Sequence, residues 1–250
     1  MEPYARDEDG KIKGFIVDLM DKISEKAGID YELYFSPDGK YGNILNENPN
    51  GMIGEVMMKK ADFAVADLTI TEARKEKVDF TEPFITNNLA AIIRKEDQHG
   101  AKTLEDLIQY NEETAKNAAE HSIAYGVLKL GATEAKIKSS DSPAAKAINQ
   151  WLDANPNDKV DTLVKGIERV NKGHFALIAE STFAEYYTGH ECNLTSLASK
   201  DLTNRQYGIA LQKGSPYLTK FNDAIKELKS AGTIKELMDR HWINNCDNKQ

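Results

Sequence analysis

The alternation of amphipathic helices with short apolar strands constrains this sequence more than any other feature. It occurs in two series, before and after a polar stretch without periodicity at residues 95–102. This rhythm is typical of α/β lobes, each large enough to bury its own core. The first series predicts helices at 14–28 and 51–61, strands at 31–35, 62–66 and 89–94, and a turn at 37–43.

The second series predicts another α/β lobe of similar construction. Its strands are apolar runs, and Glu180 lies where one of them ends and the segment ESTFAEYY begins. The second series predicts strands at 122–128, 174–180 and 205–211, helices at 103–121, 131–137, 142–155 and 160–173, and two closing helices within 216–242.

Charge and motifs exclude several classes of function. The net charge of −8, without a basic stripe, disfavours nucleic acid as a partner. There is no GxSxG, GxGxxG, Walker or HExxH motif, and no two of the five histidines have the i, i+4 spacing of a helical metal site. We therefore predict that the protein is not an enzyme and uses no cofactor or metal.

The sequence DLTITEAR places polar side chains where a turn between two buried strands would ordinarily use Gly or Pro. Arg74 offers a planar fork for a carboxylate, whereas Asp67 and Glu180 suit an ammonium, and Thr69 can serve both groups. A carboxylate and an ammonium on neighbouring atoms describe an α-amino acid. The alternative interpretation is that Arg74 makes a surface salt bridge with Glu72 or Glu76.

Two cysteines, Cys192 and Cys246, leave two possibilities open from the residues alone: buried thiols or a bridge. The sequon Asn193-Leu194-Thr195 beside Cys192 favours an extracytoplasmic surface, where a bridge is stable.

A series of segments stands out along the chain: GKYG (39–42), NGMIGEV (50–56), ADLTITEARKEKVDFTEPF (66–84), IAYGVL (123–128), GAT (131–133), ESTFAEY (180–186), QYGIA (206–210), and the closing Trp242 and Cys246. In this order they resemble the ligand-binding region of ionotropic glutamate receptors. The resemblance covers nearly the whole chain.

This resemblance implies a two-lobed α/β clamshell, similar to periplasmic amino-acid-binding proteins, with a discontinuous first lobe. The implied domains are lobe 1 at 1–89 and 208–250 and lobe 2 at 90–207. The stretch at about 95–102 is expected to be a linker in place of the pore region.

The resemblance also implies the roles of individual residues. Arg74 matches the arginine that binds the ligand α-carboxylate, and Thr69 matches the threonine that contacts both α-groups. Tyr41 matches the tyrosine that caps the ligand, and Glu180 the acid that meets its ammonium. Ala132 and Thr133 match the pair that binds the distal carboxylate, in a form similar to kainate-type receptors. The resemblance also implies a disulfide between Cys192 and Cys246.

Three departures from the family pattern concern the ligand and cleft closure. Asp67 stands where animal receptors usually have proline, and plant receptors are similar to this sequence there. Its carboxylate is expected to contact the ligand ammonium. Lys13 and Leu163 replace a glutamate and a threonine that hydrogen-bond across the cleft in many receptors, so closure is expected to rely more on the ligand.

The function implied is the extracellular ligand-binding domain of a ligand-gated ion channel, binding an α-amino acid in an interlobe cleft whose closure gates the pore. L-glutamate is the expected ligand, with small neutral amino acids as alternatives whose affinity is expected to rise with chloride at the helix start near Ala132, where water is the other candidate occupant. In the full-length receptor the domain would lie outside the cell membrane beside other subunits, and the segment itself is expected to be soluble. The alternatives are a free-standing periplasmic binding protein of a transporter and a dehydratase-like enzyme on the same clamshell.

Overall fold

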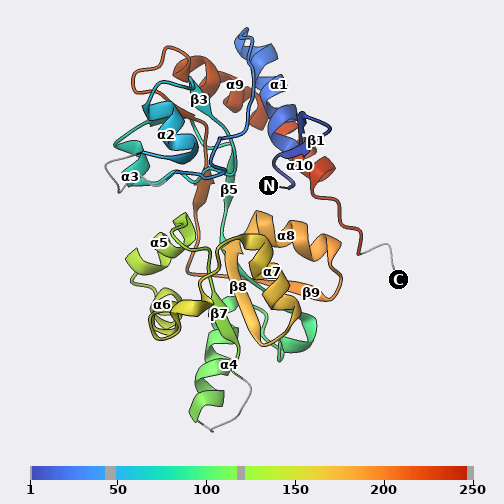
Figure 1. Cartoon of the computed structure of the whole chain (residues 1–250). Coiled ribbons are helices and arrows are strands. Elements are labelled where there is room, and N and C mark those ends of the chain that lie inside the picture. Colours follow the sequence, from blue (N-terminus) through green and yellow to red (C-terminus); the bar gives the residue numbers. More distant parts are fainter. Residues whose placement is uncertain (1, 43–48, 117–121, 247–250) are drawn as a thin grey trace. The chain divides into compact units, whose positions relative to one another are not determined.

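The computed structural model describes residues 2–42, 49–116 and 122–246 (Figure 1). Internal contacts divide the chain into two compact units, and both contain helices and a sheet, as predicted. Unit 1 comprises the chain up to Thr86 together with Gln206–Trp242. Unit 2 comprises Asn87–Arg205 together with the chain from Ile243 onward.

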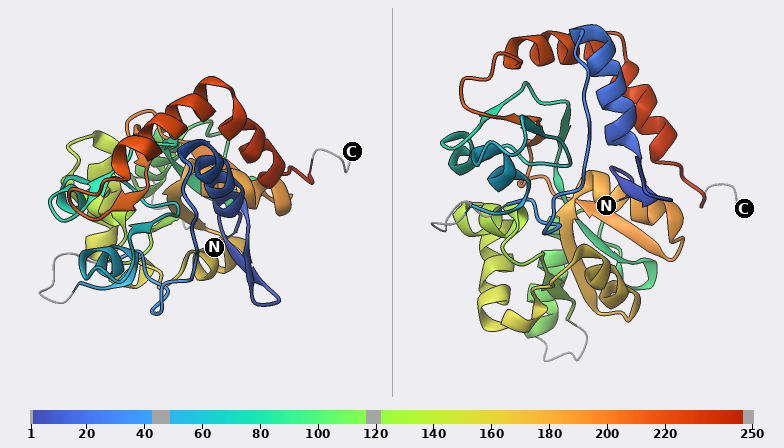
Figure 2. Two further views of the ribbon diagram at one scale, coloured as in Figure 1. Left: turned by 90° about the horizontal axis from the view of Figure 1, so that it is seen from above. Right: turned by 45° about the horizontal axis from the view of Figure 1, so that its top comes forward.

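Unit 1 contains a small antiparallel sheet with the order β3–β11–β4, and the central strand β11 pairs with both neighbours. Figure 2 shows the blue helix α1 lying along the red helices α9 and α10, which it contacts. The elements of unit 1 are β1 (Arg6–Glu8), β2 (Lys11–Lys13), α1 (Phe15–Ala27), α2 (Gly51–Met57), β3 (Phe63–Ala64), α3 (Glu72–Lys75), β4 (Asp79–Phe80), β11 (Ala210–Leu211), α9 (Leu218–Ser230) and α10 (Thr233–His241).

The helices of unit 1 form because their apolar residues recur at helical spacing and bury one face. In α1, Phe15, Leu19 and Ile23 are fully buried four residues apart. The helix ends at Gly28, whose backbone adopts the left-handed conformation (φ 62°) that glycine tolerates best. Phe221 and Ile225 of α9 join the same core, so the closing segment of the chain completes the unit that the first segment begins.

Unit 2 is organised around a four-stranded sheet with the order β7–β8–β6–β9, in which β7 and β8 are parallel and the other pairs are antiparallel. Helices cover both faces of this sheet. The elements of unit 2 are β6 (Leu89–Arg94), the 3₁₀ turn η1 (Lys95–Asp97), α4 (Leu104–Lys116), β7 (Ala124–Gly126), α5 (Ala132–Ser139), α6 (Pro143–Ala154), the 3₁₀ turn η2 (Pro156–Asp158), α7 (Leu163–Asn171), β8 (Phe175–Glu180), α8 (Ser181–His190) and β9 (Leu194–Ala198).

The sequence of β6 explains why both faces are covered. Ala91 and Ile93 belong to the core beneath α4, α5 and α6, whereas Ala90 and Ile92 belong to the core beneath α7 and α8. Alternate residues of a strand point to opposite faces, so a continuous apolar run predicts a strand buried on both sides. The predicted strand at 89–94 is confirmed with these bounds.

Two further strands, β5 (Ile85–Asn87) and β10 (Arg205–Tyr207), pair with each other and carry the chain from one unit to the other. These boundaries lie within three residues of the predicted lobe boundaries at 89 and 208. The chain beyond Trp242 differs from the prediction, because Ile243 and the following residues belong to unit 2.

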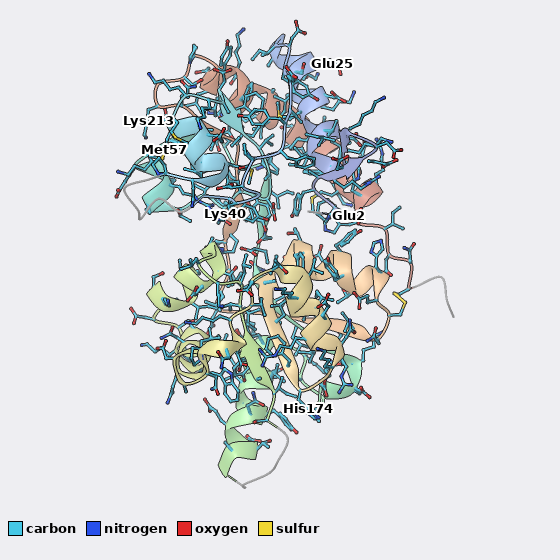
Figure 3. All side chains as sticks on the ribbon, viewed as in Figure 1. Glu2, Glu25, Lys40, Met57, His174 and Lys213 are labelled. Atoms are coloured by element: carbon cyan, nitrogen blue, oxygen red, sulfur yellow. A yellow bond between two sulfur atoms is a disulfide. The ribbon has the colours of Figure 1, made fainter. Side chains whose placement is uncertain are left out.

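The disulfide Cys192–Cys246 explains this difference at the C-terminal end. It joins the two cysteines, as the resemblance implied, with 5.3 Å between their Cα atoms. The backbone N–H of Asn245 also donates to the carbonyl of Gly189 at 2.8 Å. The covalent bond and the hydrogen bond together hold the segment after α10 on the second unit. Figure 3 shows this disulfide in yellow.

Several predicted elements differ from the structure. The predicted helix at 51–61 ends at Met57, and the predicted strand at 205–211 is split into β10 and β11. The last residues of the predicted helix at 103–121 and of the predicted turn at 37–43 lie outside the described residues. Strand β9 was not predicted.

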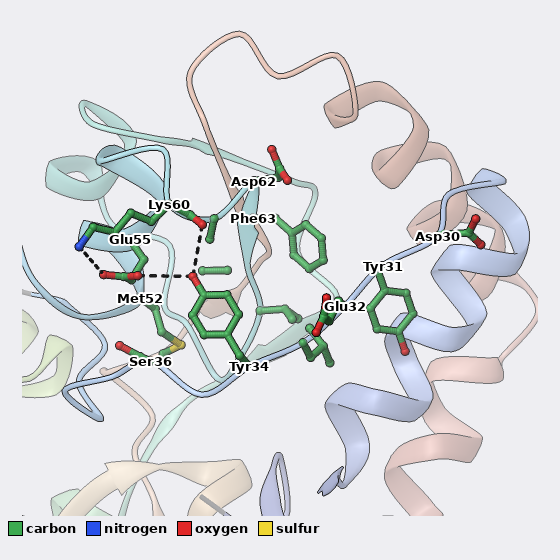
Figure 4. Close-up of a pocket in the computed structure, with 14 residues that line it drawn as sticks. Asp30, Tyr31, Glu32, Tyr34, Ser36, Met52, Glu55, Lys60, Asp62 and Phe63 are labelled. Atoms are coloured by element: carbon green, nitrogen blue, oxygen red, sulfur yellow. Dashed lines mark hydrogen bonds and ion pairs between the residues drawn. The ribbon is translucent and has the colours of Figure 1, made fainter. Parts of the chain in front are cut away.

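The predicted strand at 31–35 is extended but unpaired in the described chain. A cavity of about 310 Å³ is lined by residues of this segment and by residues around β3. In Figure 4 the hydroxyl of Tyr34 reaches to Glu55 at 3.4 Å.

Candidate functional site

The seven residues predicted to bind the ligand fall into two groups, one in each unit. Tyr41, Asp67, Thr69 and Arg74 belong to unit 1. Ala132, Thr133 and Glu180 belong to unit 2. We describe each group within its own unit.

Arg74 lies in the short helix α3, which explains the unusual turn sequence. The hydroxyl of Thr71 caps this helix by accepting from the N–H of Arg74 at 3.3 Å. The Arg74 side chain folds back, and Nη1 donates to the carbonyl of Thr69 at 2.7 Å. Arg74 is only 8% exposed, so the alternative of a surface salt bridge with Glu72 or Glu76 does not describe its position.

Thr69 is held in place by the strand that returns from unit 2. It forms an antiparallel bridge with Tyr207, and the N–H of Ile70 donates to the carbonyl of Gln206 at 2.8 Å. Thr69 is 3% exposed. Both partners of the Arg74–Thr69 hydrogen bond are therefore anchored by backbone contacts.

Asp67 and Tyr41 form the second pair in unit 1. The Tyr41 hydroxyl donates to Oδ2 of Asp67 at 2.7 Å, although 26 residues separate them. Asp67 lies three residues after the end of β3, in the region where polar residues of α/β folds commonly meet a ligand. The structure thus places a carboxylate, a phenol ring and a buried guanidinium in one unit.

In unit 2, Thr133 and Glu180 are in direct contact. The Thr133 hydroxyl donates to Oε1 of Glu180 at 3.0 Å. Thr133 lies in the first turn of α5, whose N-cap residue, Gly131, supplies no side-chain cap. Glu180 ends β8 and forms the N-cap position of α8.

Arg205 belongs to this cluster, but the sequence did not reveal it. Its Nη2 lies 3.8 Å from Oε1 of Glu180. The residue is 7% exposed, and neither Nε nor Nη2 has a hydrogen-bond partner among the described residues. A buried guanidinium with unused donors favours an anion, and Glu180 supplies only part of that charge. The only sequence signal was an arginine directly before QYGIA.

Glu134 follows Thr133 and places a carboxylate in the first turn of α5. Burial alone would raise the pKa of its carboxyl, but hydrogen bonds from Lys138, from the N–H of Leu130 and from Lys159 outweigh it and lower the pKa. Glu134 is therefore ionised at neutral pH. Its carboxylate accepts from the N–H of Leu130 at 2.6 Å, just before the helix.

Lys13 and Leu163, the two departures at the cleft edge, have local roles in the structure. Lys13 pairs with Glu8 across the β1–β2 hairpin at 2.8 Å. Leu163 is buried in the core beneath α7. Neither offers the carboxylate or hydroxyl that the family pattern has at these positions.

Two cavities in unit 1 differ in their relation to these residues. The 310 Å³ cavity in Figure 4 is lined by none of the predicted ligand residues. A cavity of about 180 Å³ is lined by Tyr41 and Asp67 among others. The smaller cavity therefore adjoins the candidate site.

Comparisons with known proteins agree with the fold. A family profile described as the ligated ion channel L-glutamate- and glycine-binding site matches residues 1–97. Glutamate receptor U1 of Xenopus laevis is 22% identical over 354 aligned positions, covering 100% of this chain and 74% of the receptor. Human glutamate receptor ionotropic delta-1 is 24% identical, covering 95% of this chain and 35% of that receptor.

A solved structure of similar fold is the Drosophila muscle GluRIIB complex with glutamate. It matches with a TM-score of 0.84 and 24% identity, covering 97% of this chain and 95% of that one. The predicted fold class is thereby confirmed. No helix among the described residues is long and apolar enough to cross a membrane. The chain is therefore similar to the ligand-binding domains of ionotropic glutamate receptors: the profile matches its first 97 residues, and the two receptors align with 95–100% of its length.

Proposed function

We propose that this chain is the extracellular ligand-binding domain of a ligand-gated ion channel and binds an α-amino acid, with L-glutamate as its principal ligand. The observation that carries the proposal is the buried Arg74, fixed on the carbonyl of Thr69 and accompanied by the acidic Asp67 in the same unit. Arg74 would bind the α-carboxylate, and Asp67 the ammonium. From unit 2, Thr133 and the start of α5 at Ala132 would bind the γ-carboxylate, and Glu180 would meet the ammonium.

The receptor assignment is favoured over a free-standing periplasmic binding protein by the alignments. The alignment with the Xenopus receptor extends over 354 positions, whereas this chain has 250 residues. The relative therefore carries many residues inside the aligned span that this chain lacks. We propose that these additional residues form a pore region, inserted near residues 95–102 of this chain in the full-length receptor. Ligand binding would act on that pore region. The domain itself would carry out no catalysis.

Asp67→Asn is expected to weaken glutamate binding about tenfold or more at low salt, because hydrogen bonds to a charged partner contribute about 1.5–3 kcal/mol. The substitution keeps the shape and leaves an oxygen to accept from Tyr41. Titration calorimetry measures the change. Asp239→Asn, on the exposed face of α10, is the matched control and should leave the affinity unchanged. Equal affinities of the Asp67→Asn variant and the wild type would make Asp67 a structural residue of the turn.

Small neutral amino acids are expected to bind better in chloride than in a large inert anion at equal ionic strength. Glutamate would satisfy the N–H groups at the start of α5, but alanine would leave them unpaired at about 1–3 kcal/mol each. Chloride at this position would restore about fivefold or more of the affinity for alanine. Glutamate affinity should not depend on the anion. If alanine binds equally in both salts, water and not chloride occupies the helix start.

A further inference from the structure

The segment that leads into β9 contains a motif that the amino-acid site does not use. Asn193-Leu194-Thr195 is the only N-x-S/T triplet in the sequence of 250 residues. In a triplet of this kind, with any residue except proline in the middle, the asparagine amide is the acceptor for an N-linked glycan. Such triplets also arise by chance, so the surroundings of Asn193 decide whether the acceptor can carry a sugar.

The acceptor side chain points outward and keeps one hydrogen available. Asn193 is exposed, whereas Leu194 beside it is 1% exposed and anchors the triplet in the core beneath α7 and α8. Nδ2 of Asn193 carries two hydrogens, and it donates to Oδ1 of Asn171 at 2.8 Å. The described part of the chain supplies no second acceptor, so a sugar can replace the other hydrogen while the contact with Asn171 persists.

The triplet and Glu180 lie at opposite ends of the sheet in unit 2. Leu89, at the start of β6, is paired with Glu180 of β8. Arg94, at the other end of β6, is paired with Leu194 of β9. The five steps from residue 89 to residue 94 span roughly 17 Å, at about 3.3 Å for each residue of a strand. A glycan on Asn193 therefore leaves the candidate ligand residues of unit 2 accessible.

The position of β9 gives the glycan a structural purpose. β9 is the last strand in the order β7–β8–β6–β9, so it has a strand partner on one side only within the described chain. An open edge of this kind can pair with another molecule unless it is covered or charged. The triplet begins directly before β9, so a hydrophilic glycan there hinders the approach of a second chain to this edge.

The backbone of Asn193 also connects the triplet with the segment at 95–102. Its carbonyl accepts from the N–H of Lys95 at 2.8 Å. Lys95 is the first residue of the segment where a pore region is proposed to be inserted. A glycan on Asn193 would therefore place this end of unit 2 on the extracellular side of the membrane.

We propose that Asn193 is an N-glycosylation site and that its glycan covers the open edge of β9. The donor is an oligosaccharide linked to a lipid pyrophosphate. Nδ2 forms a bond to C1 of the first sugar, and the bond from C1 to the pyrophosphate oxygen breaks. The lipid pyrophosphate leaves with the electron pair of that bond and takes up the proton that the amide loses. The inference rests on the proposed function for the extracellular placement alone.

Secretion of this chain from a eukaryotic cell, directed by an added signal peptide, tests the site. Mass spectrometry of the peptide containing residue 193, before and after peptide N-glycosidase, is expected to show one removable glycan. Asn193→Gln removes the acceptor, and Thr195→Val removes the hydroxyl but keeps the β-branched shape within β9. Both variants should lose the glycan, and either suffices if the other does not fold. Thr195→Ser keeps the hydroxyl and is the matched control that should retain the glycan.

The enzymatically deglycosylated chain tests the role at the edge of β9. It should aggregate faster than the glycosylated chain in light scattering, because the edge strand is uncovered. Its affinity for L-glutamate should change less than about twofold, since sites more than about 7–10 Å apart act independently. Equal aggregation of the two forms would overturn the protective role.

The outcomes separate this inference from the proposed function. A secreted wild-type chain that binds L-glutamate but carries no sugar on Asn193 would overturn the glycosylation site alone. A glycan that persists in both Asn193→Gln and Thr195→Val would overturn it as well. A glycosylated chain that binds no amino acid would refute the proposed ligand and support the glycosylation site.

Discussion

Arg74→Ala is expected to weaken amino-acid binding at least about thirtyfold. The guanidinium is 8% exposed and fixed by its hydrogen bond to the Thr69 carbonyl, so a bound carboxylate would pair with a desolvated, pre-oriented fork. Truncating one partner of such a buried charge pair costs about 2–5 kcal/mol, mostly because the other charge is left unpaired. Titration calorimetry with L-glutamate measures the loss.

Two further variants separate the role of Arg74 in binding from its role in folding. Arg74→Lys keeps the charge but loses the planar fork, and it should also bind weakly. Arg240→Ala removes an exposed arginine from α10 and should bind like the wild type. A thermal melt near that of the wild type would show that Arg74→Ala remains folded. Unchanged affinity in a folded Arg74→Ala chain would refute the assignment of this site.

Removal of the disulfide is expected to have the largest effect on stability. The bridge spans 54 residues of sequence, and the chain-entropy estimate for a loop of this length is about 4 kcal/mol. Native disulfides typically contribute about 2–4 kcal/mol. The double variant Cys192→Ser with Cys246→Ser should therefore unfold at lower denaturant concentration, with a free energy of unfolding lower by about that amount.

The loss of stability should be concentrated at the C-terminal end. Without the bridge, the segment from Ile243 is held on unit 2 by weaker contacts such as the Asn245–Gly189 hydrogen bond. Amide exchange should rise there first, while β6 and β8 in the buried sheet stay protected. Reduced wild-type protein should behave like the double variant. Identical unfolding curves for oxidised and reduced protein would contradict this prediction.

Elements with a strong local signal could be predicted from the sequence. The helix ending at Gly28 and the doubly buried strand at 89–94 have the expected bounds within one residue, because periodicity and a left-handed glycine specify them locally. The segment at 31–35 carries the same apolar alternation but forms no ladder in the described chain. Strand pairing depends on a distant partner, which the apolar pattern of one segment does not specify.

The candidate site was predictable to a different degree in each unit. The resemblance identified Arg74 and Thr69, and the structure adds that a short helix and a returning strand hold them together. The resemblance did not identify Arg205, because the burial of this side chain and its unused donors beside Glu180 arise only when β8 and β10 are folded. Nor could it reveal the cavity beside Asp67, which segments far apart in sequence line.

The most direct test of the central claim is calorimetric titration of the wild-type chain with L-glutamate, compared with glutarate. Glutarate keeps two carboxylates but lacks the α-ammonium that Asp67 and Glu180 would hold. The account predicts saturable binding of one L-glutamate per chain and at least about thirtyfold weaker binding of glutarate, since an unpaired buried carboxylate costs about 2–5 kcal/mol. Equal binding of both compounds, or no saturable binding of L-glutamate, would contradict it.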